Sequence, residues 1–223
     1  MDFLVVLVFA IAGAFALRNP LKKMPVVFYA LAIAVCVLFV TGGFFPMPRP
    51  VWSGLLLLVQ KCMLALALFS VVMFIGVFSP DSRIGRWLRP VRAELSIIAW
   101  ILALGHMAVH LASYLPRLGT TRDTVLVSFA VALVLFVLLL ILGVTSFSVV
   151  KKRMKRDTWK RVQMLAYPFF GLVYVHLMLM LLPSALQGGA AAQASVTVYS
   201  VLFVAYAGLR MRRAVIDRAG AAS

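Results

Sequence analysis

The chain alternates between long apolar runs and short breaks that carry charge or proline. Seven runs are long enough to be considered as membrane crossings, at roughly 3–17, 25–45, 52–79, 93–115, 124–149, 159–182 and 195–210. A membrane-spanning helix needs about 20 apolar residues, and only helices or closed barrels satisfy their own backbone in hydrocarbon. The runs are continuously apolar rather than alternating, which is typical of helices and not of barrel strands. We therefore predict an all-α integral membrane protein, a bundle of about seven transmembrane helices.

The first run is short enough to be compared with a secretory signal peptide. It has no basic stretch before it, and Arg18, Asn19 and Pro20 follow it where a signal peptide would have small residues for cleavage. The run is therefore interpreted as an extra N-terminal transmembrane helix within residues 1–24. Residues 25–215 then form one transmembrane domain, and residues 216–223 form a tail.

The basic residues predict the orientation of the bundle. Most of the 22 lysines and arginines lie in the breaks after the first, third, fifth and seventh runs, so they share one side. They are Arg18, Lys22, Lys23, Arg83, Arg86, Arg89, Arg92, Lys151, Lys152, Arg153, Lys155, Arg156, Lys160, Arg161, Arg210, Arg212, Arg213 and Arg218. Cytoplasmic loops carry such an excess of Lys and Arg. We expect a multi-pass protein of the cell inner (cytoplasmic) membrane, with its N-terminus outside and its C-terminus in the cytoplasm.

The composition excludes several classes of protein. Hydrophobic residues make up 64% of the chain, charged residues only 13%, and the mean hydropathy is +1.06. These values exclude a soluble enzyme, a disordered protein and a disulfide scaffold. The net charge of +16 is explained by topology and by attraction to anionic membrane lipids, so no nucleic-acid partner is expected.

All three histidines fall inside predicted helices. His106 and His110 lie in the fourth run, within GHMAVHLASY, and His176 lies in the sixth, within LVYVHLMLM. An ionisable ring in hydrocarbon is costly and suggests a function. Burial keeps such a ring neutral, which is the form that binds a metal.

The spacing brings these rings to similar depths. The fourth and sixth runs cross in the same direction, and at about 1.5 Å per residue His106 and His110 lie about 21 and 27 Å beyond Arg92. His176 lies about 26 Å beyond Trp159, so either ring can meet it in the outer half of the membrane. Two neutral imidazoles from facing helices can hold one haem b through its iron. The alternative is that the histidines only form hydrogen bonds between helices.

A few other polar residues are candidates for contacts with a haem propionate or with a quinone. Lys61 is the one basic residue in the interior of a run, about 15 Å deep, and Gln60 precedes it. Lys61 either has such a partner or extends its side chain toward the interface. Arg49 and Arg117, at the outer edge, are alternative propionate partners. No acidic residue lies beside the histidines, so we predict no catalytic residue.

The stretch from about 52 to 182 resembles the ferric-reductase-like transmembrane domain, the haem core shared by NADPH oxidases, ferric reductases and bacterial MsrQ (YedZ) proteins. RAELS at 92–96 stands where this family tends to have RRELG, and the histidine helix ends in HLASY at 110–114. Thr145 and Ser146 close the fifth run, as in the family.

Further landmarks come from the sixth run, which Trp159 opens. In MsrQ-like sequences this tryptophan is followed four residues later by a histidine and thirteen residues after that by a second one. The corresponding residues here are Gln163 and His176, and Tyr167 also fits the pattern. Glutamine is not a strong haem ligand, so the resemblance implies a single haem on the outer side, without the inner haem of two-haem relatives.

The resemblance leaves the ligand of the fourth run between two residues. Counting from Arg92 favours His106, whereas counting back from HLASY favours His110. NADPH oxidases also have histidines four apart here, the inner one being the ligand to the outer haem. This likeness favours the pair His106 and His176, with His110 as the alternative.

The resemblance implies a membrane cytochrome b that carries electrons outward. The expected donor is a membrane quinol or a cytoplasmic flavin reductase, because the chain has no flavin or nicotinamide domain and no GxGxxG motif. The expected acceptor is an extracytoplasmic redox protein, either a flavoprotein or a molybdenum enzyme. One alternative is a terminal ferric or oxygen reductase with an open outer site. Another is a haem-free transporter or assembly subunit.

Overall fold

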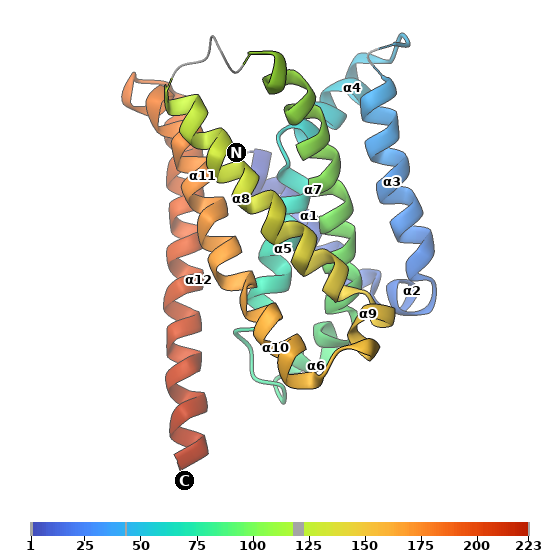
Figure 1. The fold of residues 1–223 in the computed structure, drawn as a ribbon, viewed down its shortest axis with the longest axis vertical. Helices are drawn as coiled ribbons and strands as arrows, with labels where there is room; N and C mark the ends of the chain where they lie inside the picture. Colours follow the sequence, from blue (N-terminus) through green and yellow to red (C-terminus); the bar gives the residue numbers. More distant parts are fainter. Residues whose placement is uncertain (1, 43, 118–122, 223) are drawn as a thin grey trace.

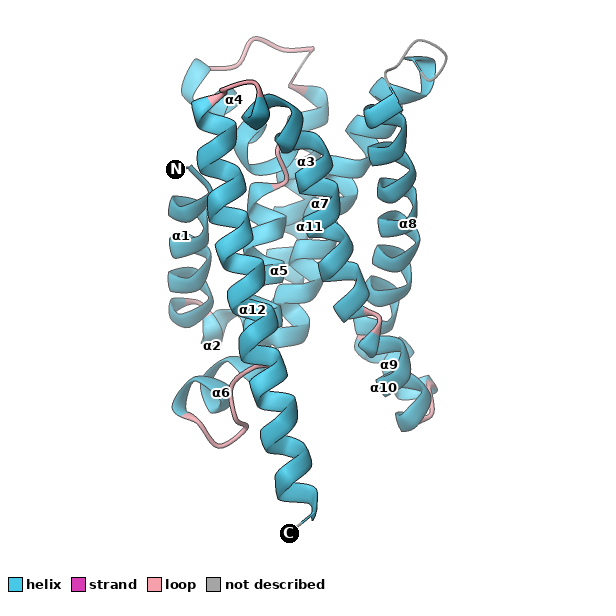
Figure 2. Ribbon diagram, turned by 90° about the vertical axis from the view of Figure 1, so that its left-hand side faces the viewer, coloured by secondary structure: helices cyan, strands magenta, loops and turns pink. Residues whose placement is uncertain are grey.

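A computed structural model describes residues 2–42, 44–117 and 123–222, and this part of the chain is helical without a strand (Figures 1 and 2). The α-helices are α1 (Asp2–Ala16), α2 (Arg18–Lys23), α3 (Pro25–Thr41), α4 (Arg49–Leu55), α5 (Met63–Ile75), α6 (Arg83–Leu88), α7 (Arg92–Tyr114), α8 (Asp123–Ser146), α9 (Ser148–Arg153), α10 (Arg156–Met164), α11 (Ala166–Leu186) and α12 (Ala190–Ala222). A π-helical turn, η1 (Leu56–Gln60), and two 3-10 turns, η2 (Arg89–Val91) and η3 (Leu115–Arg117), complete the elements.

The long helices run along the long axis of the molecule and form one bundle. Helix α5 packs against α1 and α7, α7 also packs against α3 and α8, and α11 packs between α8 and α12. The short helices α2, α6, α9 and α10 lie toward the same end, with α2 and α6 on one side of the bundle and α9 and α10 on the other, and α12 extends beyond the others at that end (Figures 1 and 2). Helix α5 is apolar around most of its circumference and largely buried, as expected for a helix inside a bundle.

Several helices are long and apolar enough to cross a membrane, which makes this a multi-pass membrane protein. Four continuous helical stretches meet this description: Arg83–Tyr114, Val125–Ser146, Arg156–Leu186 and Ala190–Ala219. A fifth is obtained if Arg49–Gln60 and Met63–Ile75, which meet at a bend of 46°, form one span. Helices α1 and α3 are also apolar but have only 15 and 17 residues. The number of seven crossings and the orientation of the termini stay predictions.

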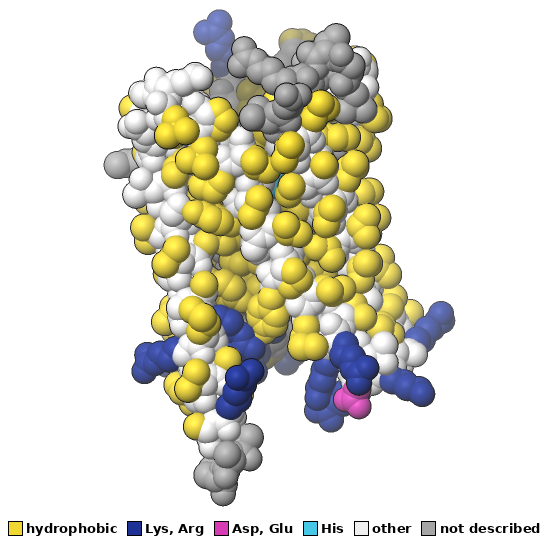
Figure 3. All heavy atoms as spheres, turned by 60° about the vertical axis from the view of Figure 1, so that its left-hand side comes forward, with side chains coloured by type: hydrophobic (Ala, Val, Ile, Leu, Met, Phe, Trp, Pro, Cys, Tyr) yellow, Lys and Arg dark blue, Asp and Glu magenta, His cyan; other side chains and the backbone are white. Residues whose placement is uncertain are grey.

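The surface of the bundle has the character of a lipid-facing surface. Large apolar side chains are exposed along it, among them Phe9 at 72%, Val26 at 71% and Val204 at 68%. Figure 3 shows apolar side chains over the middle of one face, with lysines and arginines gathered mainly near the end where α12 projects. We call this the basic end. So much contiguous apolar surface would drive aggregation in water, whereas lipid accommodates it.

The third apolar run is not the single helix that its pattern predicts. The helix changes to the π-helical turn η1 at Leu56 and stops at Lys61, and α5 begins only at Met63. Between them Cys62 has φ +55°, in the left-handed region. A left-handed residue cannot continue a right-handed helix, so the backbone breaks and bends here. The run contains neither proline nor glycine at this point, which is why its pattern indicated one continuous helix.

The last apolar run forms a longer helix than the predicted 195–210. Helix α12 continues through the residues expected to be a tail, as far as Ala222. Beyond the apolar part the sequence is rich in alanine and arginine, which favour helices. Arg213 and Asp217 also form an i,i+4 ion pair of 2.7 Å. The helix therefore persists after its lipid-facing pattern ends.

Two glycines allow close packing around α7. A Cβ atom at Gly105 would lie 2.5 Å from the Cys36 sulfur, so glycine lets α3 approach α7 next to His106. A Cβ atom at Gly143 would overlap the indole of Trp100, so glycine lets α7 and α8 interlock. These contacts fix the position of the α7 histidines relative to the rest of the bundle.

Candidate functional site

Both histidines of α7 bind the same backbone oxygen. The Nδ1 atom of His106 donates to the carbonyl oxygen of Gln60 at 2.6 Å, and the Nε2 atom of His110 donates to it at 3.2 Å. The centroids of the two rings are 4.4 Å apart. In an unbroken α-helix this carbonyl would accept from the amide four residues later. Because the helix breaks at Cys62, the carbonyl is available to α7 instead.

These bonds distinguish the two rings chemically. A carbonyl oxygen can only accept, so each bonded ring nitrogen carries the proton of a neutral imidazole. In His106 the proton is on Nδ1, which leaves the Nε2 lone pair available to a metal. In His110 the proton is on Nε2, which leaves only Nδ1. The two histidines, equivalent in the sequence pattern, therefore present different nitrogens.

His176 on α11 is held in the same way as His106. Its Nδ1 atom donates to the carbonyl oxygen of Ser128 at 3.2 Å and lies 3.1 Å from the hydroxyl oxygen of the same residue. The Nε2 lone pair is again left available. Ser128 belongs to α8 and is only 2% exposed. We did not predict Ser128 from the sequence, although a lone hydroxyl within the apolar run VSFAVALV was a usable signal.

Aromatic contacts connect the two histidine helices across α8. The His110 ring stacks on Tyr114 with centroids 5.9 Å apart, and Tyr114 meets Phe129 at 6.4 Å. Phe129 directly follows Ser128, the partner of His176. The histidines of α7 and of α11 thus belong to one connected group, away from the basic end.

Two of the nitrogen atoms available in this group could bind the iron of a porphyrin. A haem iron asks the protein for only two axial ligands, and neutral imidazole is the most frequent one. An ion without a porphyrin needs more ligands, and within the described residues no group of three or more His, Cys, Asp or Glu is placed to hold one. The free Nε2 atoms of His106 and His176 fit the axial role.

The other predicted site residues are less closely tied to the histidines. Gln60 contributes its backbone oxygen to the histidines, and its contact with a propionate or a quinone stays a prediction. Lys61 follows it with an exposed side chain, and Arg49 is exposed at the start of α4. The side chain of Arg117 lies outside the described residues.

A separate cavity of about 310 Å³ lies toward the basic end, between α5, α7, α8, α10 and α11. Trp100, Trp159 and Gln163 are part of its lining. The side chain of Gln163 donates to the Thr145 hydroxyl at 2.9 Å, and the indole of Trp159 donates to the Thr145 carbonyl at 3.0 Å. Hydrogen bonds therefore join Thr145 of α8 to Trp159 and Gln163 of α10 at the edge of this cavity.

Comparison with known proteins gives the family. Residues 61–174 match the family described as ferric reductase like transmembrane component. The chain belongs to this family. The match includes His106, His110 and Gln163 and ends two residues before His176. Membership indicates a redox or electron-transfer role in the membrane, in agreement with the resemblance found in the sequence.

A relative also matches most of the chain. An uncharacterized protein of Treponema pallidum (strain Nichols) is 41% identical in an alignment 220 positions long, which covers 92% of this chain. The chain spans 59% of the length of that relative. No solved structure matches the chain.

Proposed function

We propose that this ferric-reductase-like protein is a membrane electron-transfer subunit that holds one haem b between His106 on α7 and His176 on α11. The observation that carries the proposal is the common arrangement of these two rings. Each donates its Nδ1 proton to a backbone carbonyl and has a free Nε2 atom. Such a bond fixes the tautomer and the orientation of a ligating histidine and makes its free nitrogen more basic.

In this proposal the other residues of the group support the two ligands. The carbonyl of Gln60 orients His106, and Ser128 orients His176. His110 packs against the His106 ring and shares the same acceptor, but its Nε2 atom is engaged, so we assign it a supporting role. When bound, the haem supplies the one-electron chemistry, and the protein sets its potential and its access to partners.

The proposed direction of transfer is supported by the placement of charge, through the orientation that it implies for the bundle. The basic end faces the cytoplasm according to the positive-inside rule, so the histidine group lies toward the outer face of the inner membrane. A quinol reaches such a site by moving laterally in the bilayer, whereas an electron from a cytoplasmic flavin reductase must cross about half of a 30 Å hydrocarbon layer. We therefore favour quinol as the donor. An extracytoplasmic flavoprotein or molybdenum enzyme is the proposed acceptor.

Lys61 and Arg49 are the proposed partners of the haem propionates. Both are exposed cations: Lys61 directly follows Gln60 at the break in the helix, and Arg49 lies at the start of α4. The propionates need a cation or water near the surface. Quinone contact at Gln60 and Lys61 is the alternative use of the same residues.

Haem stoichiometry tests the ligand assignment. The protein is expressed in haem-replete cells, purified in detergent, and its haem content is measured as the pyridine complex. We expect about one haem for each wild-type chain, and a loss of most of it in His106→Ala and in His176→Ala. The matched control is His110→Ala, which removes a histidine from the same helix face and should keep its haem with an altered spectrum. Loss of haem from His110→Ala but not from His106→Ala would reverse the assignment, and no haem in any form would refute the proposal.

Reduction of the purified protein tests the donor. Menaquinol or ubiquinol analogues should reduce the haem of the wild-type protein within seconds. If Lys61 contacts only a propionate, they should reduce the haem of a Lys61→Met variant equally fast. Reduction by NADH with a cytoplasmic flavin reductase, but by no quinol, would contradict the quinol step. Oxygen consumption or ferric reduction by the isolated chain would instead favour a terminal reductase.

A further inference from the structure

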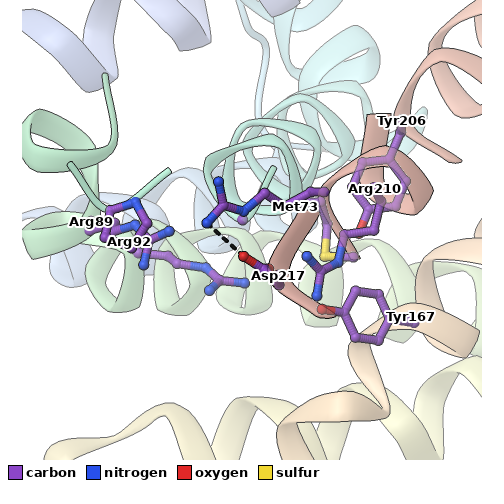
Figure 4. Close-up of a pocket in the computed structure, with 10 residues that line it drawn as sticks. Met73, Arg89, Arg92, Tyr167, Tyr206, Arg210 and Asp217 are labelled. Carbon is purple, nitrogen blue, oxygen red and sulfur yellow. Dashed lines mark ion pairs between the residues drawn. The ribbon is translucent and has the colours of Figure 1, made fainter. Parts of the chain in front are cut away.

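A cavity at the basic end carries a concentration of positive charge that the proposed electron-transfer role does not use. It has a volume of about 290 Å³ and lies between the basic ends of α5 and α7 and the extended part of α12 (Figure 4). We call it the arginine cavity. Its charged lining consists of Arg89, Arg92, Arg210, Arg213 and Asp217.

The charges of this lining do not balance. Asp217 is its one carboxylate, and it pairs with Arg213 at 2.7 Å. Within the described part of the chain, Arg89, Arg92 and Arg210 form no ion pair. Three guanidinium groups therefore surround one space without an acidic partner in it.

Two of these guanidinium groups are held in place by neutral groups. Arg89 donates from Nη2 to the carbonyl oxygen of Phe78 at 2.8 Å. Arg210 lies over the Tyr167 ring, 5.2 Å from its centroid. Figure 4 shows Arg89 and Arg92 on one side of the cavity, and Arg210 with Tyr167 on the other. These contacts orient the cations without neutralising them.

We propose that the arginine cavity binds the phosphate group of an anionic ligand. Guanidinium is planar and offers paired donors that match two phosphate oxygens at once, and a phosphate charge relieves the repulsion among neighbouring cations. Metal cations are repelled by the same charges. Tyr167 and Tyr206 line the cavity and add hydroxyl groups. The ligand is either the headgroup of an anionic phospholipid, which the basic end meets in a membrane, or a free phosphate.

The site has a structural consequence that does not depend on the haem proposal. Its arginines come from η2 and α7 on one side and from α12 on the other. A phosphate held between them would connect the extended part of α12 to the bundle. Binding should therefore stabilise the folded protein in proportion to ligand concentration.

Ligand-dependent thermal unfolding tests the proposal. The delipidated full-length chain in a neutral detergent is heated while tryptophan fluorescence is recorded. One arm compares inorganic phosphate with chloride at equal ionic strength, and the other compares micelles that contain phosphatidylglycerol with micelles that contain phosphatidylcholine. The site variant is Arg92→Gln with Arg210→Gln. The matched control is Arg86→Gln with Arg212→Gln, which removes the same charge from the same end outside the cavity.

We expect wild type and the control pair to gain unfolding temperature in at least one arm, and the site variant to need about tenfold more ligand for the same gain. A response only to phosphatidylglycerol identifies a lipid headgroup, and a response to inorganic phosphate as well identifies a general phosphate site. Equal responses of the site variant and the control, or none in wild type, would overturn the proposal. If the double variant does not fold, Arg210→Lys, which keeps the charge but loses the paired donors, should still weaken binding severalfold.

Discussion

Replacement of Ser128 by alanine gives a sharp test of how His176 is positioned. The change removes the hydroxyl that lies 3.1 Å from Nδ1 of His176, while the carbonyl of the same residue remains at 3.2 Å. The ring therefore keeps one of its two acceptors and its tautomer. A hydrogen bond of this kind contributes about 1 kcal/mol net, which corresponds to about fivefold weaker haem binding. Loss of the bond also makes the ligand less basic, so the reduction potential should rise.

The assay for Ser128→Ala is the rate at which haem passes to excess apomyoglobin, together with a spectroelectrochemical titration. The matched control is Ser70→Ala. Ser70 is also buried, at 1% exposure, and its hydroxyl donates to the Leu66 carbonyl of its own helix at 2.8 Å. This control loses a similar bond without touching a histidine, so we expect haem affinity and potential close to wild type.

Three results would refute the reasoning about Ser128. Equal haem loss in both serine variants would mean that Ser128 stabilises the bundle in general. An unchanged affinity and potential in Ser128→Ala would mean that its hydroxyl does not act on the ligand. A fall in potential would contradict the direction of the argument.

Three further predictions concern the histidines and the fold around them. Gly143→Ala should lower the free energy of unfolding by about 1–3 kcal/mol, because the new methyl group overlaps Trp100 and this outweighs the better helix propensity of alanine. Gly171→Ala has open space at its Cβ position and should be neutral or stabilising by up to about 1 kcal/mol. Reversible denaturation in mixed micelles measures both values. Cys62→Gly should stabilise the protein by about 1 kcal/mol, because φ at this position is +55° and glycine adopts the left-handed region without strain. Cys62→Val should destabilise the protein in the same assay. A valine variant as stable as wild type would contradict the left-handed conformation of residue 62. Gln60→Ala should keep its full haem content, since only the backbone oxygen binds the histidines, and haem loss in that variant would show that the side chain matters.

The helical membrane character of the protein could be predicted from the sequence, because it depends on local properties. Continuous apolar runs must be helical in lipid, and the lysines and arginines in alternate breaks do gather at one end of the bundle. The family could also be predicted, from the order and spacing of short motifs that include RAELS, HLASY, Thr145 and Trp159. In the structure Trp159 and Gln163 both form hydrogen bonds with Thr145.

Other features of the chain could not be predicted in this way. The run around Cys62 has no residue that breaks a helix by itself, so its hydropathy pattern did not indicate the bend of 46°. The pattern also did not indicate that α12 continues to Ala222. The apolar pattern stops where the lipid-facing surface stops, whereas residues that favour a helix continue beyond it.

The sequence by itself determined that two α7 histidines and one α11 histidine lie in apolar helices, and which residue types were available to hold a haem. Only the tertiary structure decided how His106 and His110 differ. Their common partner is the backbone oxygen of Gln60, made available by the break at Cys62. Every residue carries such an oxygen, so no side-chain pattern reveals which one is left free by the helix. The direction in which the Gln60 carbonyl points is set by how α5 and α7 pack.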